Sequence, residues 1–528
     1  MSEAAADDPH HAWKPKANPW AIVVVVTLAA FMEILDTTIV NVSLPHIAGS
    51  LGASYDESTW ALTSYLLANG IVLTISGWLS SLLGRKRYFV ICVFMFTVCS
   101  FLCGSATSLG QLVFFRLLQG FFGGGMQPSQ QSIILDTFPP DKRAAAFGVT
   151  AIATIVAPVL GPTLGGYITD TYSWRWVFFI NIPVGAAAVF LISMLVEDPP
   201  WLPRSTLRDI DYVGLALIAL GLGALQVTLD RGQDEDWLSS PFIRTTATLA
   251  AFGIIGAIAW LLTAKKPVVD LSVLKDRNFA MSCVCIAATG GVLYAGAVVI
   301  PQFTQSLLGY NATWSGLVLS PGALMIIFMI PIVGRIMPLV QTRFLIALGF
   351  VCMGASFFYS MRLTTDMDFT SLMLLRAAQT LGLAFLFVPI STIAFANVPR
   401  QLNGDATALF VMLCNVFGSI GISVASALIL RRSQVHQAYM SQWASPLHQP
   451  FNVLVQTYER ALLAMGRTAS AAHQEALGKV YQVYQDQAAT LAYSDVFLIA
   501  GVISFLVAPF CILLLSPRRG GGGPAGAH

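Results

Sequence analysis

The sequence predicts an all-α membrane protein with fourteen transmembrane helices, and three observations support this fold class. Of the 528 residues, 56% are hydrophobic and 11% are charged, whereas a soluble domain carries roughly 25% charged residues. A soluble globule of this size could not cover so much apolar surface, but lipid can face apolar side chains directly. The other two observations are the spacing of the apolar runs and the distribution of basic residues between them.

Fourteen apolar runs are each long enough to cross a bilayer, which takes about 20 predominantly apolar residues. The first run is too long for the apolar core of a cleaved signal peptide, so we expect it to remain as the first helix. The fourteen helices are expected near 20–44, 58–80, 88–106, 109–135, 143–169, 175–196, 211–229, 243–263, 279–305, 312–338, 342–362, 369–396, 405–430 and 495–515.

The basic residues predict the orientation, because Lys and Arg are enriched in cytoplasmic loops. An even number of helices places both termini on one side, and most of the 29 Lys and Arg residues fall on that side, including Arg85, Lys86 and Arg87. The loop around 230–236 on the other side is acidic. We therefore expect a multi-pass protein of the bacterial inner membrane with cytoplasmic tails over 1–19 and over the Gly-rich residues 516–528.

The two halves of the chain resemble each other weakly. Arg116-Leu-Leu-Gln119 recurs as Arg376-Ala-Ala-Gln379, and Pro139 recurs as Pro399, both at an offset of 260 residues (376 − 116 and 399 − 139). Transporters built from such repeats bind substrate between the repeats near the middle of the membrane. We expect six-helix bundles over 20–196 and 279–515, separated by a two-helix insert with its loops over 197–278.

One polar segment, residues 431–493, precedes the last predicted helix on the side opposite the termini, which is the periplasmic side in this orientation. Residues 459–465 and 470–492 are helical by composition, and Ser470 is a candidate N-cap. The segment is either a surface cover with no partner or a docking site for another protein, and the sequence favours neither.

Five motifs lie in the N-terminal half. They are Leu35-Asp36-Thr37 through Leu44-Pro45, Gly77-Trp78-Leu79 with Gly84-Arg85-Lys86-Arg87, Arg116 through Gly120, Gly161-Pro162 through Gly165-Gly166, and Trp174-Arg175-Trp176 through Pro183. Together they resemble the major facilitator superfamily, and within it the fourteen-helix drug:proton antiporters of the EmrB/QacA type. This resemblance covers nearly the whole chain and implies a major facilitator fold with two pseudo-symmetric halves. It also implies proton-driven efflux of amphipathic or hydrophobic toxic compounds.

Two of these motifs have a structural interpretation. Gly161, Pro162, Gly165 and Gly166 let a neighbouring helix approach closely and bend the fifth helix. The family associates this motif with exporters, and ordinary small-residue packing is the alternative. Gly77, Gly84 and Arg85 belong to the turn after the second helix. The family pattern has an Asp where this chain has Ser81, so the sequence leaves open whether Arg85 joins a charge relay or only sets topology.

Four charged residues inside the membrane stand out as functional candidates: Glu33, Asp36, Arg116 and Arg376. Each costs at least about 2.5–3.5 kcal/mol at mid-helix, so each needs a reason. Glu33 and Asp36 are three residues apart and share a helix face, so one of the two is expected to hold a proton near neutral pH. We predict that Glu33, Asp36 and Arg116 form a proton-coupling site, as the resemblance also implies for Arg116. The alternative is a structural ion pair with Arg116. Arg376 is expected to be structural or to face substrate.

Aromatic and amide side chains suit amphipathic compounds, because they combine apolar area with adaptable hydrogen bonds. For each candidate, ordinary helix packing is an equal alternative. The predicted substrate-binding residues are Asn41, Gln127, Gln130, Gln302, Phe303, Arg376, Asn415 and Phe417. The cysteines lie in apolar runs without metal-ligand spacing, so we expect no metal site, and no cofactor beyond a proton gradient.

A transporter, and not an enzyme, is the predicted class, with no nucleic-acid partner. The first hypothesis is a proton-driven multidrug exporter. The second is a proton-coupled transporter of one specific metabolite or lipid-like compound. An ATP-driven pump would need a GxxxxGK[ST] loop, which the sequence lacks. A receptor or scaffold would not need the intramembrane charges. The resemblance further implies a periplasmic adaptor and an outer-membrane channel as partners, with 431–493 as the docking surface for the adaptor.

Overall fold

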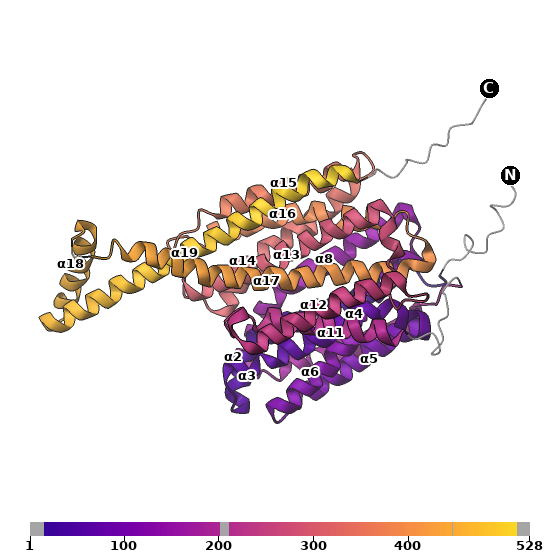
Figure 1. Ribbon diagram of the computed structural model, residues 1–528, viewed down its shortest axis with the longest axis horizontal. Coiled ribbons are helices and arrows are strands. Elements are labelled where there is room, and N and C mark those ends of the chain that lie inside the picture. Colours follow the sequence, from indigo (N-terminus) through magenta and orange to yellow (C-terminus); the bar gives the residue numbers. More distant parts are fainter. Residues whose placement is uncertain (1–14, 201–210, 446, 515–528) are drawn as a thin grey trace, which may run out of the picture.

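The computed structural model describes residues 15–200, 211–445 and 447–514. All regular secondary structure in these residues is helical, and the long helices lie side by side in one elongated bundle (Figure 1). The predicted tail over 516–528 and most of the tail over 1–19 lie outside the described residues. The terminal end of the bundle is the end where α2 begins and the last helix finishes.

The N-terminal bundle contains the first six membrane crossings, two of which are broken into helix pairs. A short helix, α3 (Tyr55–Ser58), connects the first two crossings. The crossings are α2 (Pro19–Leu51), α4 (Trp60–Leu83), α5 (Arg85–Gly104), α6 with α7 (Leu109–Gly123 and Met126–Thr137), α8 (Pro140–Thr171), and α9 with α10 (Trp176–Phe179 and Asn181–Leu195).

The break between α6 and α7 has a packing cause. Gly124 and Gly125 keep helical backbone angles there. A Cβ on Gly124 would lie 2.4 Å from the backbone oxygen of Asn69, and a Cβ on Gly125 would lie 2.3 Å from the Tyr88 hydroxyl. Only glycines allow α4 and α5 to approach this closely, and the two helices together make a single crossing.

The insert and the C-terminal bundle supply the other eight crossings. Short 3₁₀ segments flank them: η2 (Trp237–Ser239), η3 (Leu271–Lys275), η4 (Arg400–Leu402) and η5 (Ala508–Leu513). The insert is α11 (Tyr212–Arg231) and α12 (Pro241–Thr263), and the bundle is α13 (Arg277–Ser306), α14 (Ala312–Ile336), α15 (Thr342–Ser360), α16 (Phe369–Ala394), α17 (Asn403–Ser441) and α19 (Ala469–Val507).

The fourteen predicted helices are confirmed. Within the described residues, twelve helices are long and apolar enough to cross a membrane by length and composition. The two segments of α8, Pro140–Pro158 and Leu160–Thr171, meet at an angle of 43° and make the thirteenth crossing. The α6–α7 pair is the fourteenth. The bend in α8 falls at Pro158 and Pro162, because proline removes a helical hydrogen bond and clashes with the preceding turn.

The two halves pack in corresponding ways. In the N-terminal half α2 packs on α8 and α4 packs on α6, and in the C-terminal half α13 packs on α17 and α14 packs on α16. The halves meet along two seams, α8 against α14 and α4 against α17. The insert lies beside the second seam, where α11 packs on α4 and the Ser423 hydroxyl of α17 donates to the Leu229 carbonyl at 2.8 Å.

The polar segment forms an arm, which we define as residues 431–445 and 447–493. It consists of the end of α17, the helix α18 (Gln449–Ala464) and the start of α19. These elements project beyond the bundle at the end opposite the chain termini (Figure 1). Val455 of α18 packs against Ala476 and Val480 of α19, so the arm has a small apolar core of its own.

Three sequence-based details of the arm are wrong. The helix predicted at 459–465 begins earlier, at Gln449, and Thr468 instead of Ser470 precedes α19 as its N-cap. The helix predicted at 470–492 is also continuous with the last membrane helix. The reason is that no Pro or Gly stands between 479 and 500, so the helix continues through the change from polar to apolar sequence.

Candidate functional site

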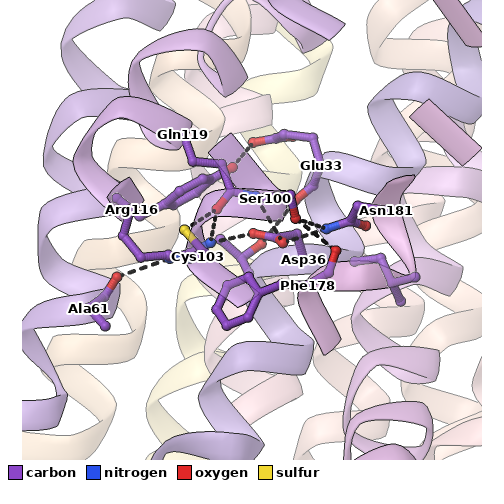
Figure 2. A network of polar contacts seen from close by, with 12 residues as sticks. Glu33, Asp36, Ala61, Ser100, Cys103, Arg116, Gln119, Phe178 and Asn181 are labelled. Carbon is purple, nitrogen blue, oxygen red and sulfur yellow. Dashed lines mark hydrogen bonds and ion pairs between the residues drawn. The ribbon is translucent and has the colours of Figure 1, made fainter. Parts of the chain in front are cut away.

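Helix α2 carries Glu33 and Asp36 into the interior of the N-terminal bundle. The two residues are 3% and 1% exposed, respectively. Their spacing of three residues places both side chains on the face of α2 that turns toward α4, α6 and α10. Figure 2 shows the two carboxylates among polar side chains from several helices. The predicted proton-coupling residues therefore lie together, although each carboxylate has its own set of partners.

Asp36 is paired with a cation and two amides. Arg116 donates from Nη1 to Asp36 Oδ2 at 2.5 Å, and neither side chain is exposed to solvent. Gln119 Nε2 and Asn181 Nδ2 both donate to Asp36 Oδ1, at 3.2 and 2.8 Å. Asn181 also donates to Ser100 Oγ at 3.0 Å (Figure 2). The Asp36 carboxylate is thus held by groups from α6 and α10, and Ser100 of α5 supports it through Asn181.

Arg116 is fixed in place by more than the ion pair. Its Nε donates to the Ala61 carbonyl at 3.1 Å, and its Nη1 also donates to Gln119 Oε1 at 2.9 Å. The guanidinium carbon lies 4.1 Å from the centre of the Tyr65 ring, close enough for a cation–π interaction. A guanidinium with several donors satisfied in one plane keeps a single orientation, so Asp36 faces a preorganised cation.

Glu33 has only neutral partners. Tyr65 Oη and Asn69 Nδ2 donate to Glu33 Oε1 at 3.1 and 2.9 Å, and Gln127 Nε2 donates to Oε2 at 2.7 Å. Tyr65 links the two carboxylates, because its hydroxyl bonds Glu33 while its ring covers Arg116. From the other half, Tyr294 of α13 lies within electrostatic range of Glu33. Glu33 is therefore held by neutral donors from α4 and α7.

The predicted substrate-binding residues are dispersed. Gln127 joins the Glu33 cluster, whereas Gln130 is buried and donates to Thr27 and Thr150 within the N-terminal bundle. Asn415 accepts a hydrogen bond from Tyr294 at 3.2 Å, and Phe303 is buried against Tyr493 with ring centroids 5.3 Å apart. The remaining four differ in exposure: Asn41, Gln302 and Phe417 are exposed, and Arg376 is buried. Their substrate role stays a prediction.

The residues around Arg85 form a latch between the two halves at the terminal end. Arg85 makes a buried ion pair with Asp136 of α7 and donates to the Ser132 carbonyl at 3.0 Å. Asn403 of α17 donates to Asp136 at 3.2 Å, and the hydroxyls of Ser132 and Thr407 lie 2.6 Å apart. We call Arg85, Ser132, Asp136, Asn403 and Thr407 the latch. The carboxylate partner of Arg85 is thus Asp136, while the Ser81 hydroxyl donates to the Trp78 carbonyl of its own helix.

The motif glycines lie where backbones approach closely. A Cβ on Gly77 would lie 2.7 Å from Asp405 Oδ1 on α17, and Gly84 has φ +87° with the Asp198 carboxylate beside it. A Cβ on Gly161 would lie 2.0 Å from Thr38 Oγ1 of α2, and one on Gly165 would lie 3.0 Å from the Ile39 carbonyl. Gly166 is also buried. The glycines of α8 therefore allow it to contact the helix that carries Glu33 and Asp36.

Sequence reasoning missed most of the groups that hold the two carboxylates. Tyr65, Asn69, Ser100 and Asn181 were not singled out as site residues, although Asn181 lies in a quoted motif. A signal existed for the two asparagines, because each is an amide inside a long apolar run, where an unpaired polar group is costly. The identity of their partners depends on helix rotation, which periodicity alone does not give.

Comparison with known proteins identifies the family. The chain matches the Major Facilitator Superfamily over residues 26–422. It is 34% identical over 508 residues to the multidrug export protein EmrB of Escherichia coli (strain K12), covering 96% of this chain and 97% of that protein. It is 33% identical over 512 residues to the fatty acid resistance protein FarB of Neisseria gonorrhoeae, covering 97% and 98%. The human organic anion transporter MFSD10 (TETRAN) has a similar fold, with a TM-score of 0.56, 13% identity, and coverage of 93% of this chain and 100% of that structure. The fourteen-helix chain, with its buried charge cluster and two packed halves, belongs to the major facilitator superfamily.

Proposed function

We propose that this protein exports amphipathic or hydrophobic toxic compounds across the bacterial inner membrane in exchange for protons. The observation that carries the proposal is the buried pair of carboxylates on α2, each with a different set of partners. A charged group inside a membrane span is expensive and marks an ion or substrate path by default. The relatives named for multidrug export and for fatty acid resistance support export of apolar or amphipathic compounds.

The two carboxylates have different tasks in this proposal. Asp36 keeps its ion pair with Arg116, and its proton is taken up only when that pair separates. Glu33 has neutral donors in place of a cation, so either a proton or a cationic substrate can neutralise it. Proton binding and substrate binding then compete at one carboxylate, which is the simplest way to exchange one for the other.

The experiment replaces each carboxylate by its amide. Asp36→Asn is expected to abolish proton-linked efflux while the protein still inserts in the membrane. Glu33→Gln is expected to weaken efflux of a cation such as ethidium more than efflux of a neutral compound. The assay follows drug accumulation in an efflux-deficient strain with and without an uncoupler. Normal efflux by Asp36→Asn would refute the proton-coupling role, and an equal effect of Glu33→Gln on both compounds would refute a substrate-charge role.

We also propose an orientation for the protein, based on its charges. We place the terminal end in the cytoplasm and the arm in the periplasm, since the basic loops lie at the terminal end. In this orientation the latch closes the cytoplasmic end of the space between the two halves. Cysteine substitution at an exposed arm position such as Leu447, followed by labelling with a membrane-impermeant maleimide in intact cells, tests the orientation. Labelling only after lysis would refute it.

We further propose that the protein is the inner-membrane part of a tripartite pump, with the arm docking a periplasmic adaptor that leads to an outer-membrane channel. The arm exposes large apolar side chains, including Trp443, Leu447, Val453, Leu463 and Met465. Such side chains on a projecting helical hairpin suit a protein partner. Deletion of residues 440–490 should abolish co-purification of the adaptor. Co-purification that persists after this deletion would refute the assignment.

A second candidate function is proton-coupled transport of one lipid-like compound. It is favoured by the relative named for fatty acid resistance. The two functions differ in breadth, so a panel of chemically unrelated drugs distinguishes them. Resistance to many compounds supports the multidrug exporter, whereas resistance to fatty acids alone supports the second function.

A further inference from the structure

Arg376 on α16 is a buried cation without an anion. Its side chain is 3% exposed, and its Nη1 donates to Gln379 Oε1 at 3.2 Å. The Nε hydrogen has no partner in the part of the chain that the structure describes, and no ion pair joins Arg376 to a carboxylate of those residues. A buried guanidinium is normally paired, so this arrangement needs an explanation.

The N-terminal half indicates which group Arg376 lacks, because there the corresponding arginine has a carboxylate partner. At the same offset of 260 residues, Arg116 corresponds to Arg376 and Gln119 to Gln379, and Gly296 is a residue of α13 that lies beside Arg376. Ser100, which belongs to the Asp36 cluster, corresponds to Ser360, and Gln379 Nε2 donates to Ser360 Oγ at 2.8 Å. The second half thus repeats the arginine, the glutamine and the serine, but it has a glycine beside the arginine.

The space beside Arg376 is where the carboxylate would lie. A Cβ built on Gly296 would lie 3.4 Å from Arg376 Nη1, an ordinary van der Waals distance, and apart from the adjoining backbone of α13 no other atom of the described residues lies within 4 Å. The sequence has no Asp or Glu from 277 to 365 or from 369 to 404, which covers the membrane-spanning parts of α13 to α16. The chain therefore leaves room for a Cβ beside Arg376 and supplies no acid from the membrane-spanning parts of α13 to α16.

We propose that Arg376 binds the carboxylate of an amphipathic organic acid, which enters the space that Gly296 leaves open. A guanidinium suits this group because its planar fork matches a carboxylate, and its Nε edge is unoccupied here. The inference deepens the proposed export function and rests on it. Glu33 in the first half is the site for cationic groups, and Arg376 in the second half is the site for anionic groups.

The test measures equilibrium binding of radiolabelled dodecanoate to the purified full-length protein. Arg376→Gln removes the cation. Gly296→Asp supplies an internal carboxylate that pairs with Arg376, as Asp36 pairs with Arg116, and so competes with the ligand. Both variants should bind dodecanoate roughly 10- to 100-fold more weakly, which corresponds to the loss of a charge-assisted hydrogen-bonded pair. Gly296→Asn has nearly the same volume as Gly296→Asp and no charge, so it measures the cost of filling the space, and its loss should be less than about threefold.

A second ligand tests whether a variant binds dodecanoate weakly only because it is misfolded. Dodecyltrimethylammonium has the same chain length and the opposite charge, and its affinity for Gly296→Asp should not fall. Absence of dodecanoate binding to the parental protein, undiminished binding to Gly296→Asp, or an equal loss in Gly296→Asn would each overturn the inference. A different result would refute the proposed export function alone. In that case the binding pattern is as expected, but cells that express the parental protein accumulate drugs as fast as cells without it.

Discussion

The buried pair of Asp36 and Arg116 should be strongly coupled energetically. Asp36 has three donors, and Arg116 is one of them at 2.5 Å. Removing one member of a buried ion pair leaves the other charge uncompensated and costs about 3–5 kcal/mol. Arg116→Gln would leave the Asp36 carboxylate with two amide donors, so a loss near the lower end of this range, about 3 kcal/mol, is expected.

The double variant Asp36→Asn/Arg116→Gln removes both charges and should be more stable than Arg116→Gln alone. We expect the two substitutions to be non-additive by about 0.5–3 kcal/mol, the range found for residues in direct contact. The assay is unfolding of the purified protein in detergent, followed by circular dichroism for the parental protein, both single variants and the double variant. If the two losses add within about 0.5 kcal/mol, the pair does not interact as described.

Three further predictions follow from the geometry. Gly161→Ala should destabilise the protein by about 1–3 kcal/mol, because the new Cβ would lie 2.0 Å from Thr38 Oγ1. Gly49→Ala is the matched control, since a Cβ built there meets no atom within 4 Å. Equal melting temperatures of the two variants would contradict the packing argument. Asp136→Asn should weaken the latch, so that maleimide labels a cysteine placed at Thr407 about tenfold faster. This rate corresponds to a loss of roughly 1.4 kcal/mol in the free energy of opening the latch. Unchanged labelling would show that Asp136 does not hold the two halves together. Asp211 accepts a hydrogen bond from the Gly214 backbone N–H as the N-cap of α11, and it also accepts one from Trp260 at 2.8 Å. Asp211→Ala should therefore lower the free energy of unfolding by about 1–2 kcal/mol, measured by thermal unfolding. A loss no larger than that of Asp236→Ala would argue against this role.

The sequence predicted which segments cross the membrane, because each crossing needs a long apolar run. The ends of the helices were less predictable. The first helix was expected to end near residue 44 but continues to Leu51, since Pro45 is accommodated inside the helix. The interruption between α6 and α7 depends on how closely α4 and α5 approach Gly124 and Gly125, and that is a tertiary contact.

The candidate site could be predicted in part, because its charged residues lie inside apolar runs. Glu33, Asp36 and Arg116 stand out because charges inside apolar runs are rare and costly. Amides such as Asn69 and Asn181 give a weaker signal, and their roles depend on the rotation of α4 and α10 about their axes. The carboxylate partner of Arg85 was unpredictable from the local motif, because Asp136 lies 51 residues further along the chain.

Helix α17 connects the two ends of the molecule as one rigid rod. It begins at the latch with Asn403 and ends in the arm at Ser441, and its 39 residues give a length of about 58 Å. In a helix of that length, a small rotation at one end causes a large displacement at the other end. When the halves separate at the latch and the second half tilts by roughly 10°, the far end of α17 swings by about 10 Å. A separation of the two halves at the latch would thus move the arm at the opposite end of the molecule, together with any protein bound to it.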